Sequence, residues 1–237
     1  MLKVLKKIAF GISSRFSKKS FSQCGEDLIM EFIFRELKIE RPVYLDVGAH
    51  HPYYLSNTAL MYLKGCKGIS IEPDPDLFKV IQRERPNEIA LNVGVGSGES
   101  ITADFYVMNV STLNTFSKAE AERYAEYPDK SIKAVIQIPL LSLSSVITKH
   151  LGNKAPNFIS IDVEGMDLAI VQSFDFTKWK PEVFCVETLS YTEDASEVKL
   201  TAVIEFLQSK GYFLYADTYI NSIFVDRSKW ARRGSQM

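Results

Sequence analysis

The segment Val43–His51 reads VYLDVGAHH, a short apolar strand that ends with the carboxylate of Asp46 and a glycine. The segment Ile69–Asp74, ISIEPD, repeats the pattern with Glu72 as its acid. The two acids stand about one βαβ unit apart, so the two strands should lie side by side in a parallel sheet. Ligands of open α/β sheets bind beyond such strand ends, where a carboxylate accepts hydrogen bonds from both hydroxyls of a ribose. The two segments therefore predict an α/β fold with a nucleoside site.

The glycines after the first strand narrow the choice of ligand. A dinucleotide site uses the pattern G-x-G-x-x-G, whose backbone amides contact a pyrophosphate at a helix N-terminus. Here Gly48 is followed by His50 and Tyr53 at the positions of the second and third glycines. The pattern thus favours a nucleoside ligand without a pyrophosphate, and S-adenosylmethionine is the commonest of these.

The composition is that of an ordinary globular chain. Its 237 residues are 46% hydrophobic and 24% charged, which is enough for one well-filled core. The formal net charge of −1 gives no reason to expect a nucleic-acid partner. The cysteines, Cys24, Cys66 and Cys185, match neither a zinc spacing nor a disulfide framework, which indicates a reducing compartment and a cytoplasmic location. Nothing in the sequence indicates an oligomeric state.

Residues 1–20 are expected to form a basic N-terminal extension, and residues 21–237 a single domain. The apolar run at residues 8–12 is shorter than the roughly 7–15 residues of a signal-peptide core. No stretch approaches the ~18 apolar residues of a membrane span. Peripheral contact of the basic segment with a membrane surface is one interpretation. A solvated extension is the interpretation that we favour.

Hydrophobic periodicity and turn signals predict strands that alternate with helices. Strands are expected at residues 43–47, 68–71, 89–95, 157–161 and 182–186, with helices at 22–37, 54–63, 74–85, 143–150 and 197–210 and one ending at 173. Residues 101–108 resemble an antiparallel or edge strand, 109–133 an irregular polar segment, and 136–141 a short strand. A hairpin at 213–216 and 222–225 follows. This order matches the Rossmann-like fold of class I methyltransferases, an α/β fold with a seven-stranded, mostly parallel sheet and helices on both faces.

Seven short motifs occur in order along the chain. They are FSQCGED at 21–27, LDVGA at 45–49, SNT at 56–58, IEP at 71–73, LNVGV at 91–95, TLNTFS at 112–117 and IDVEG at 161–165. From about Phe21 to Arg227 the chain therefore resembles the FkbM family of S-adenosylmethionine-dependent methyltransferases. The resemblance implies O-methyl transfer to a hydroxyl of a sugar, nucleotide sugar, glycan or natural-product precursor. Many relatives carry a histidine after the last motif, where this chain has Met166.

The expected cofactor site contains residues from the motifs and the strand ends. They are Gln23, Asp46, Gly48, Asn57, Glu72, Pro73, Asn92 and Ser97. Glu72 should accept hydrogen bonds from the ribose hydroxyls, and Asp46 should position the ammonium group of the methionine part. Asn57 is expected near the methionine carboxylate, although capping of a helix also explains it. Asn92 and Ser97 are expected at the adenine edge, although turns use the same residue types.

Catalysis is expected at the end of the strand that neighbours the first one in the sheet. Methyl transfer is an in-line displacement, so placement of the acceptor oxygen supplies much of the acceleration. An alcohol must also lose its proton, which gives a nearby carboxylate or histidine the role of general base. Asp162 is the first candidate and Glu164 the second, followed by His51 and His50. The alternative for Asp162 is a structural carboxylate bonded to loop amides.

Glu187 should lie next to Asp162 at the end of the following strand. Two such carboxylates are a weak signature of a divalent metal ion, which would lower the pKa of the acceptor hydroxyl. Residues 112–127 are expected to form much of the acceptor pocket. Aromatic side chains that could stack on a sugar are Tyr53, Tyr54, Phe105, Tyr106 and Phe116. Two alternatives stay open, a noncatalytic nucleoside-binding protein and an NAD-type sugar-modifying oxidoreductase.

Overall fold

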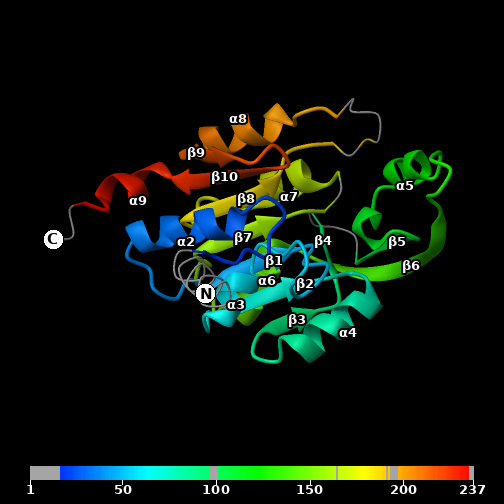
Figure 1. The fold of residues 1–237 in the computed structure, drawn as a ribbon, viewed down its shortest axis with the longest axis horizontal. Helices are drawn as coiled ribbons and strands as arrows, with labels where there is room; N and C mark the ends of the chain where they lie inside the picture. Colours follow the sequence, from blue (N-terminus) through cyan, green and yellow to red (C-terminus); the bar gives the residue numbers. More distant parts are fainter. Residues whose placement is uncertain (1–16, 97–100, 164, 191, 193–196, 235–237) are drawn as a thin grey trace, which may run out of the picture.

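The computed structural model describes residues 17–96, 101–163, 165–190, 192 and 197–234. A seven-stranded sheet forms its centre, with the strand order β3-β2-β1-β7-β8-β10-β9 (Figure 1). The strands are β1 (Tyr44–Val47), β2 (Gly68–Ile71), β3 (Ile89–Leu91), β7 (Phe158–Ile161), β8 (Val183–Glu187), β9 (Tyr212–Asp217) and β10 (Asn221–Asp226). The first five pair in parallel, whereas β10 runs antiparallel to both of its neighbours. The predicted class I methyltransferase fold is confirmed.

The middle strands are short and fully buried because helices cover the sheet on both faces. Their register aligns the ends at which ligands bind. Val47, the last residue of β1, pairs with Ile71 of β2 and with Ile161 of β7. The loops that follow these three strands therefore begin at the same edge of the sheet.

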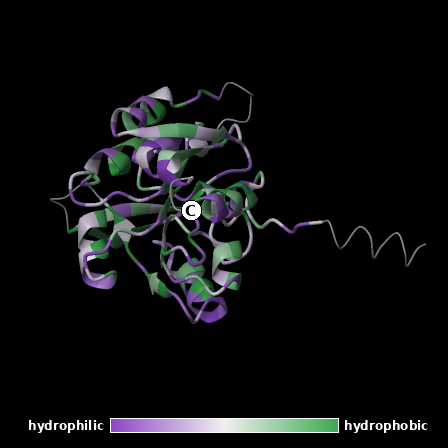
Figure 2. Ribbon diagram, turned by 90° about the vertical axis from the view of Figure 1, so that its left-hand side faces the viewer, coloured by the Kyte–Doolittle hydropathy of each residue, from purple (hydrophilic) through white to green (hydrophobic). Residues whose placement is uncertain are grey.

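Helices cover both faces of the main sheet. They are α2 (Glu26–Glu36), α3 (Ala59–Leu63), α4 (Pro75–Glu84), α6 (Leu143–His150), α7 (Asp167–Ser173), α8 (Thr201–Ser209) and α9 (Arg227–Arg232). One hydrophobic core contains buried side chains of α6, α7 and α8, and a second core contains those of α2 and α3. The helices carry both hydrophilic and hydrophobic segments, as expected for elements with one buried side (Figure 2). Helix α9, which the sequence did not predict, packs Trp230 against the second core.

A second sheet lies to one side of the main sheet (Figure 1). Its strands are β4 (Gly94–Val95), β5 (Thr102–Met108) and β6 (Ile132–Leu141), and the 3₁₀-helix η1 (Ser111–Leu113) and helix α5 (Lys118–Tyr124) lie between β5 and β6. This arrangement corrects two predictions. The strand expected at 89–95 divides between the two sheets, and the short strand at 136–141 begins at Ile132 because it pairs along β5.

Within the described residues, no helix is both long enough and apolar enough to span a membrane. Three predictions concern residues outside the described ranges. They are most of the basic extension, Ser97 as a cofactor contact and Glu164 as a catalytic candidate.

Candidate active site

A cavity of about 660 Å³ opens at the edge where β1, β2, β7 and β8 end. One side of it consists of residues that end or follow these strands, which we call the strand wall: 46–50, 71–73, 160, 162–163 and 187. A second part of the lining, which we call the loop wall, consists of residues 111–116, 189–190, 192, 197 and 219–220. Gln23, residues 54–57, residues 93–95 and Phe105 complete the lining. Six predicted site residues therefore share one cavity with Asp162: Gln23, Asp46, Gly48, Asn57, Glu72 and Pro73.

Gly48 brings the ends of β1 and β7 into contact. Its φ of 81° lies in the left-handed region, and a Cβ atom there would stand 1.8 Å from the carbonyl oxygen of Asp162. Only glycine fits this turn without displacing backbone. The glycine was expected to let the cofactor approach, and in the structure it also lets a neighbouring strand approach.

Glu72 presents a buried carboxyl group to the cavity. The backbone N–H of His50 donates to one oxygen at 2.7 Å, and that of Asp74 donates to the other at 2.8 Å. Burial raises the pKa of Glu72 to about 8, although these two hydrogen bonds act in the opposite direction. A carboxylate offers about four acceptor positions, so each oxygen keeps one for a further donor. This geometry fits a ribose with two neighbouring hydroxyls.

Asp46 is also buried, and its carboxylate accepts a 2.5 Å hydrogen bond from the hydroxyl of Thr58. Burial raises the pKa of Asp46 to about 6, while the Thr58 hydroxyl and the charge of Arg85 lower it. Asn57, from the same segment as Thr58, lines the cavity and donates to the hydroxyl of Ser160 at 3.2 Å. Segment 54–58 is thus attached to both β1 and β7.

Gln23 reaches the cavity because two acids of the same motif hold its loop in place. Asp27 accepts hydrogen bonds from Ser20, Phe21 and Ser22. Glu26 accepts from Thr218, in the turn between β9 and β10, and from Asn221, the first residue of β10. The acids of the motif are therefore structural, and Gln23 is the residue that they position.

Asn92 lies behind the cavity wall. Its side-chain amide donates to the carbonyl oxygens of Glu72 and Pro73, both at 2.9 Å. It therefore supports the turn that presents Glu72, whereas the sequence suggested contact with adenine.

Asp162 and Glu187 meet in the strand wall at the ends of neighbouring strands. Burial and the nearby carboxylates of Asp46 and Glu26 raise the pKa of Asp162, and a side-chain hydrogen bond with Glu187 lowers it. Asp167, at the start of α7, was not singled out from the sequence. It is buried, accepts a 3.2 Å hydrogen bond from the backbone of Val163, and has a pKa raised by burial and by Asp162.

The two neighbouring histidines have different environments. His50 lines the cavity, and its Nε2 lies 3.0 Å from the hydroxyl of Ser111 in the loop wall. His51 is not part of the lining, and its Nδ1 accepts hydrogen bonds from the backbone N–H groups of Tyr53 and Tyr54. The structure therefore favours His50 over His51 as a residue that touches a ligand.

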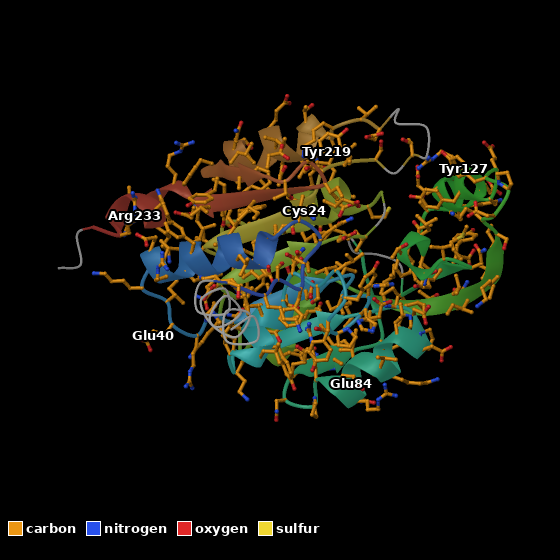
Figure 3. All side chains as sticks on the ribbon, viewed as in Figure 1. Cys24, Glu40, Glu84, Tyr127, Tyr219 and Arg233 are labelled. Carbon is orange, nitrogen blue, oxygen red and sulfur yellow. The ribbon has the colours of Figure 1, made fainter. Side chains whose placement is uncertain are left out.

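The loop wall is joined by side-chain contacts. Asn114 donates to Asp74 at 2.9 Å, and Glu197 accepts a 2.8 Å hydrogen bond from the hydroxyl of Tyr219. Tyr219 lies at the end of the main sheet that faces the second sheet, and Tyr127 lies beside the second sheet (Figure 3). Of the predicted acceptor segment 112–127, only residues 112–116 belong to the lining. Of the predicted aromatic residues, Tyr54, Phe105 and Phe116 belong to it.

Backbone strain is concentrated at this cavity. Among the described residues, five that are not glycine have a positive φ, and three of these line the cavity: His50, Leu55 and Tyr219. Such conformations cost free energy and gather at functional sites. Leu55 and Tyr219 carry no sequence signal for this role, because their residue types do not favour the left-handed region.

The described residues contain no group of three or more histidine, cysteine, aspartate or glutamate side chains arranged to hold a metal ion. The proposed metal thus depends on the two carboxyls of Asp162 and Glu187, and it stays a prediction.

Comparisons with known proteins agree with this geometry. The family profile described as "Methyltransferase FkbM domain" matches residues 46–214, which is more than half of the chain. Comparison with curated proteins finds no match.

Three solved structures illustrate the likeness of fold. A TehB-like SAM-dependent methyltransferase from Corynebacterium glutamicum is 8% identical, with 94% of this chain and 97% of that chain covered and a TM-score of 0.43. An O-methyltransferase from Bacillus cereus in complex with SAH is 8% identical, with 95% and 89% covered and a TM-score of 0.41. A putative caffeoyl-CoA O-methyltransferase from Staphylococcus aureus is 9% identical, with 93% and 91% covered and a TM-score of 0.44.

Proposed function

The chain belongs to the FkbM family of S-adenosylmethionine-dependent methyltransferases, and we propose that it methylates a hydroxyl group of a sugar, nucleotide sugar, glycan or natural-product precursor. The observation that carries the proposal is the strand wall. There the Glu72 carboxyl, with free acceptor positions, shares one cavity with Asp162 on a neighbouring part of the sheet. The first is suited to a ribose and the second to an acceptor oxygen.

The proposed cofactor pose follows the order of the strands. Glu72 accepts from the ribose hydroxyls, and Pro73 with the backbone near 93–95 contacts the adenine. Asp46, Asn57 and Gln23 contact the methionine part, with Asp46 nearest the ammonium group. The cofactor supplies an electrophilic methyl group on a sulfonium. Carboxylates around the cavity stabilise the positive charges of that ligand.

The proposed chemistry is an in-line displacement assisted by a base. Asp162 would accept the proton of the acceptor hydroxyl during methyl transfer, and its hydrogen bond with Glu187, which lowers the pKa of Asp162, would favour the ionised form beforehand. The raised pKa of Asp162 suits this role, because a general base works best when its pKa lies near the working pH.

Charge favours neutral acceptors within the proposed class. Apart from two tyrosines, the ionisable side chains among the described residues of the lining are five carboxyl groups and one histidine: Asp46, Glu72, Asp162, Glu187, Glu197 and His50. Carboxylates repel a phosphate or pyrophosphate at short distance. We therefore expect plain sugar hydroxyls to be better acceptors than those of nucleotide sugars.

We also propose that residues 21–237 act as one domain, because helices pack on both faces of the main sheet and the second sheet contributes Gly94, Val95 and Phe105 to the same cavity. Two residues of the extension contact this unit, since Ser20 donates to Asp27 and Lys18 pairs with Glu31, and any contact with membranes would come from the basic residues of the extension.

Calorimetric titration with S-adenosylmethionine and its demethylated product tests the cofactor site. Glu72→Gln should weaken binding by about a hundredfold or more, because two hydrogen bonds to a charged group are each worth about 1.5–3 kcal/mol. Glu84→Gln, on the exposed side of α4, is the matched control and should bind like the wild type. A well-folded wild type that binds neither ligand would contradict the proposal.

A methyl-transfer assay with neutral glycosides, amino sugars and nucleotide sugars tests the acceptor, with and without EDTA. Transfer to oxygen is expected, with neutral acceptors preferred. Transfer to nitrogen alone would contradict O-methylation, and loss of activity in EDTA would support the metal prediction.

A further inference from the structure

Arg85 is an ionisable residue that the site described above does not use. It follows α4, and its side chain is only 1% exposed. One guanidinium nitrogen, NH1, donates to the hydroxyl of Thr58 at 3.0 Å. The other, NH2, donates to the hydroxyl of Ser56 at 2.8 Å and to the carbonyl oxygen of Pro52. The guanidinium thus contacts three residues of the segment that connects β1 to α3.

Glu88 balances the buried charge of Arg85 on the other side. Its carboxylate lies 3.5 Å from NH1 and is itself fully buried. It accepts further hydrogen bonds from the hydroxyl of Ser70, at 2.8 Å, and from that of Tyr44. The rings of Tyr53 and Tyr62 lie 5.8 and 5.4 Å from the guanidinium carbon. A buried ion pair rarely stabilises a fold more than apolar side chains of the same volume would, so its presence here calls for another explanation.

The hydrogen bonds run in one direction from Arg85 to the cavity. A guanidinium can only donate, so the hydroxyl of Thr58 accepts from it and must direct its own proton elsewhere. That proton goes to the carboxylate of Asp46 at 2.5 Å. Arg85 therefore sets the direction of the shortest hydrogen bond that Asp46 receives.

Arg85 also holds part of the cavity lining in place. Residues 54–57 line the cavity, and they lie between the two points, Pro52 and Thr58, that Arg85 contacts. Within this segment Leu55 has a φ of 54°, a conformation that costs free energy and needs support from its surroundings. The contacts of Arg85 supply that support from behind the wall.

We propose that Arg85 is a positioning residue for cofactor binding, which keeps Asp46 ionised through Thr58 and holds residues 52–58 against the ligand. The inference rests on the proposed function, because Asp46 is taken to contact the ammonium group of the cofactor. It assigns a role to a residue outside the cavity and outside the seven motifs.

The electrostatic surroundings of Asp46 agree with this role. Burial raises its pKa to about 6, and Thr58 and Arg85 are the main influences that lower it, together with Ser160. Glu88 raises it, and the carboxylates of Glu72 and Asp162 interact with Asp46 at the same edge of the sheet. Without the positive charge of Arg85, Asp46 should hold its proton to a higher pH and attract an ammonium group less.

The test compares Arg85→Met with Arg83→Met, which changes an exposed arginine in the last turn of α4. Affinity for S-adenosylmethionine is measured by calorimetry between pH 6 and 8, with 5′-methylthioadenosine as a second probe that lacks the ammonium group. We expect Arg85→Met to raise the pKa of Asp46 by about one unit, so that S-adenosylmethionine binding weakens about fivefold at pH 6, about twofold at pH 7 and hardly at all at pH 8. The second probe should change less, Arg85→Lys should recover part of the loss, and Arg83→Met should match the wild type.

Thr58→Val keeps the test decisive if Arg85→Met does not fold. It removes only the hydroxyl between Arg85 and Asp46 and should shift the pH profile in the same direction. The inference is overturned if a folded Arg85→Met or Thr58→Val variant keeps the affinity and pH profile of the wild type. It is also overturned if both probes weaken equally at every pH. Failure of the wild type to bind S-adenosylmethionine would instead overturn the proposed function.

Discussion

The two walls of the cavity are built in different ways. In the strand wall, backbone groups set the geometry: Gly48 lies against the carbonyl of Asp162, and two backbone N–H groups hold Glu72. In the loop wall, several contacts are made by side chains: Tyr219 donates to Glu197, and Asn114 donates to Asp74 in the segment that follows β2. Backbone contacts depend little on which side chains surround them, whereas side-chain contacts change with single substitutions.

The difference indicates which wall binds the cofactor and which wall selects the acceptor. A cofactor common to a whole family needs a site that survives substitution, and a sheet edge provides it. An acceptor that differs between relatives needs a surface that varies easily, which loops provide. Substitutions in the strand wall should therefore affect cofactor binding, chemistry or folding. Substitutions in the loop wall should affect the choice of acceptor and should not change the affinity for the cofactor.

Asp162→Asn should have the largest effect and should sharpen this comparison. Loss of a general base typically lowers a rate by about 10²–10⁴-fold, so kcat for methyl transfer should fall by that factor. Affinity for S-adenosylmethionine should stay within about threefold, because the amide keeps the shape of the carboxyl. Asp129→Asn, at an exposed position, is the control. A normal kcat in Asp162→Asn would return Asp162 to the structural role considered from the sequence.

Gly48→Ala should have the next largest effect, on folding. A left-handed residue with a Cβ atom costs about 1–2 kcal/mol, and overpacking against the Asp162 carbonyl adds about 1–3 kcal/mol. The free energy of unfolding, measured in urea, should fall by about 3 kcal/mol. Gly65→Ala is the matched control, since Gly65 has a φ of 77° and nothing within 4 Å of the added atom. If the free energy of unfolding falls equally in both variants, the contact between β1 and β7 can relax to accept the added atom.

The parts of the site that could be predicted from the sequence are those encoded by neighbouring residues. The carboxylates of Asp46 and Glu72 each follow an apolar run, so local pattern and parallel topology were enough to bring them to one edge. The strand 68–71 was predicted with its observed bounds for the same reason. Where position in the chain determines position in the sheet, sequence reasoning works.

The parts that could not be predicted depend on partners far apart in the chain. Arg85 reaches Asp46 only through Thr58, and no local pattern encodes that path. Asn92 had the residue type for an adenine contact, but the backbone carbonyls of Glu72 and Pro73 use its amide. Strand β6 is longer than its hydrophobic pattern because pairing with β5 extends it. In each case a tertiary contact decided between roles that the residue type allowed.

The pH dependence of cofactor binding tests the role assigned to Glu72 in the strand wall. Ribose hydroxyls bind best to an ionised carboxylate, and Glu72 has a pKa of about 8 in the ligand-free protein. Affinity for 5′-methylthioadenosine should therefore rise roughly tenfold per pH unit up to about pH 8 and then level off. Calorimetry in buffers of different ionisation enthalpy should detect the proton released. A constant affinity between pH 6 and 9 would contradict the assignment of Glu72.

The same group should also influence folding. Because the pKa of Glu72 is raised above the ordinary value of 4.5, the folded protein binds a proton that the unfolded chain has lost between about pH 4.5 and 8. The contribution of Glu72 to stability is thus present below that window and is lost as the pH rises through it. Glu72→Gln, which imitates the protonated form, should flatten this part of the stability profile.

Tyr219→Phe should have the smallest effect, and it tests the loop wall. The substitution removes the hydroxyl that donates to Glu197 and keeps the exposed aromatic ring. The backbone of residue 219, with its φ of 76°, should stay the same. An exposed hydrogen bond to a carboxylate is worth about 0.5–1.5 kcal/mol, so KM for the acceptor should rise about two- to tenfold. The Kd of S-adenosylmethionine should not change, since the hydroxyl of Tyr219 donates to Glu197 and not to a residue of the proposed cofactor site. Tyr215→Phe, on β9 outside the lining, is the control. If Tyr219→Phe instead raises the Kd of S-adenosylmethionine and leaves the KM of the acceptor unchanged, the loop wall belongs to the cofactor site as well.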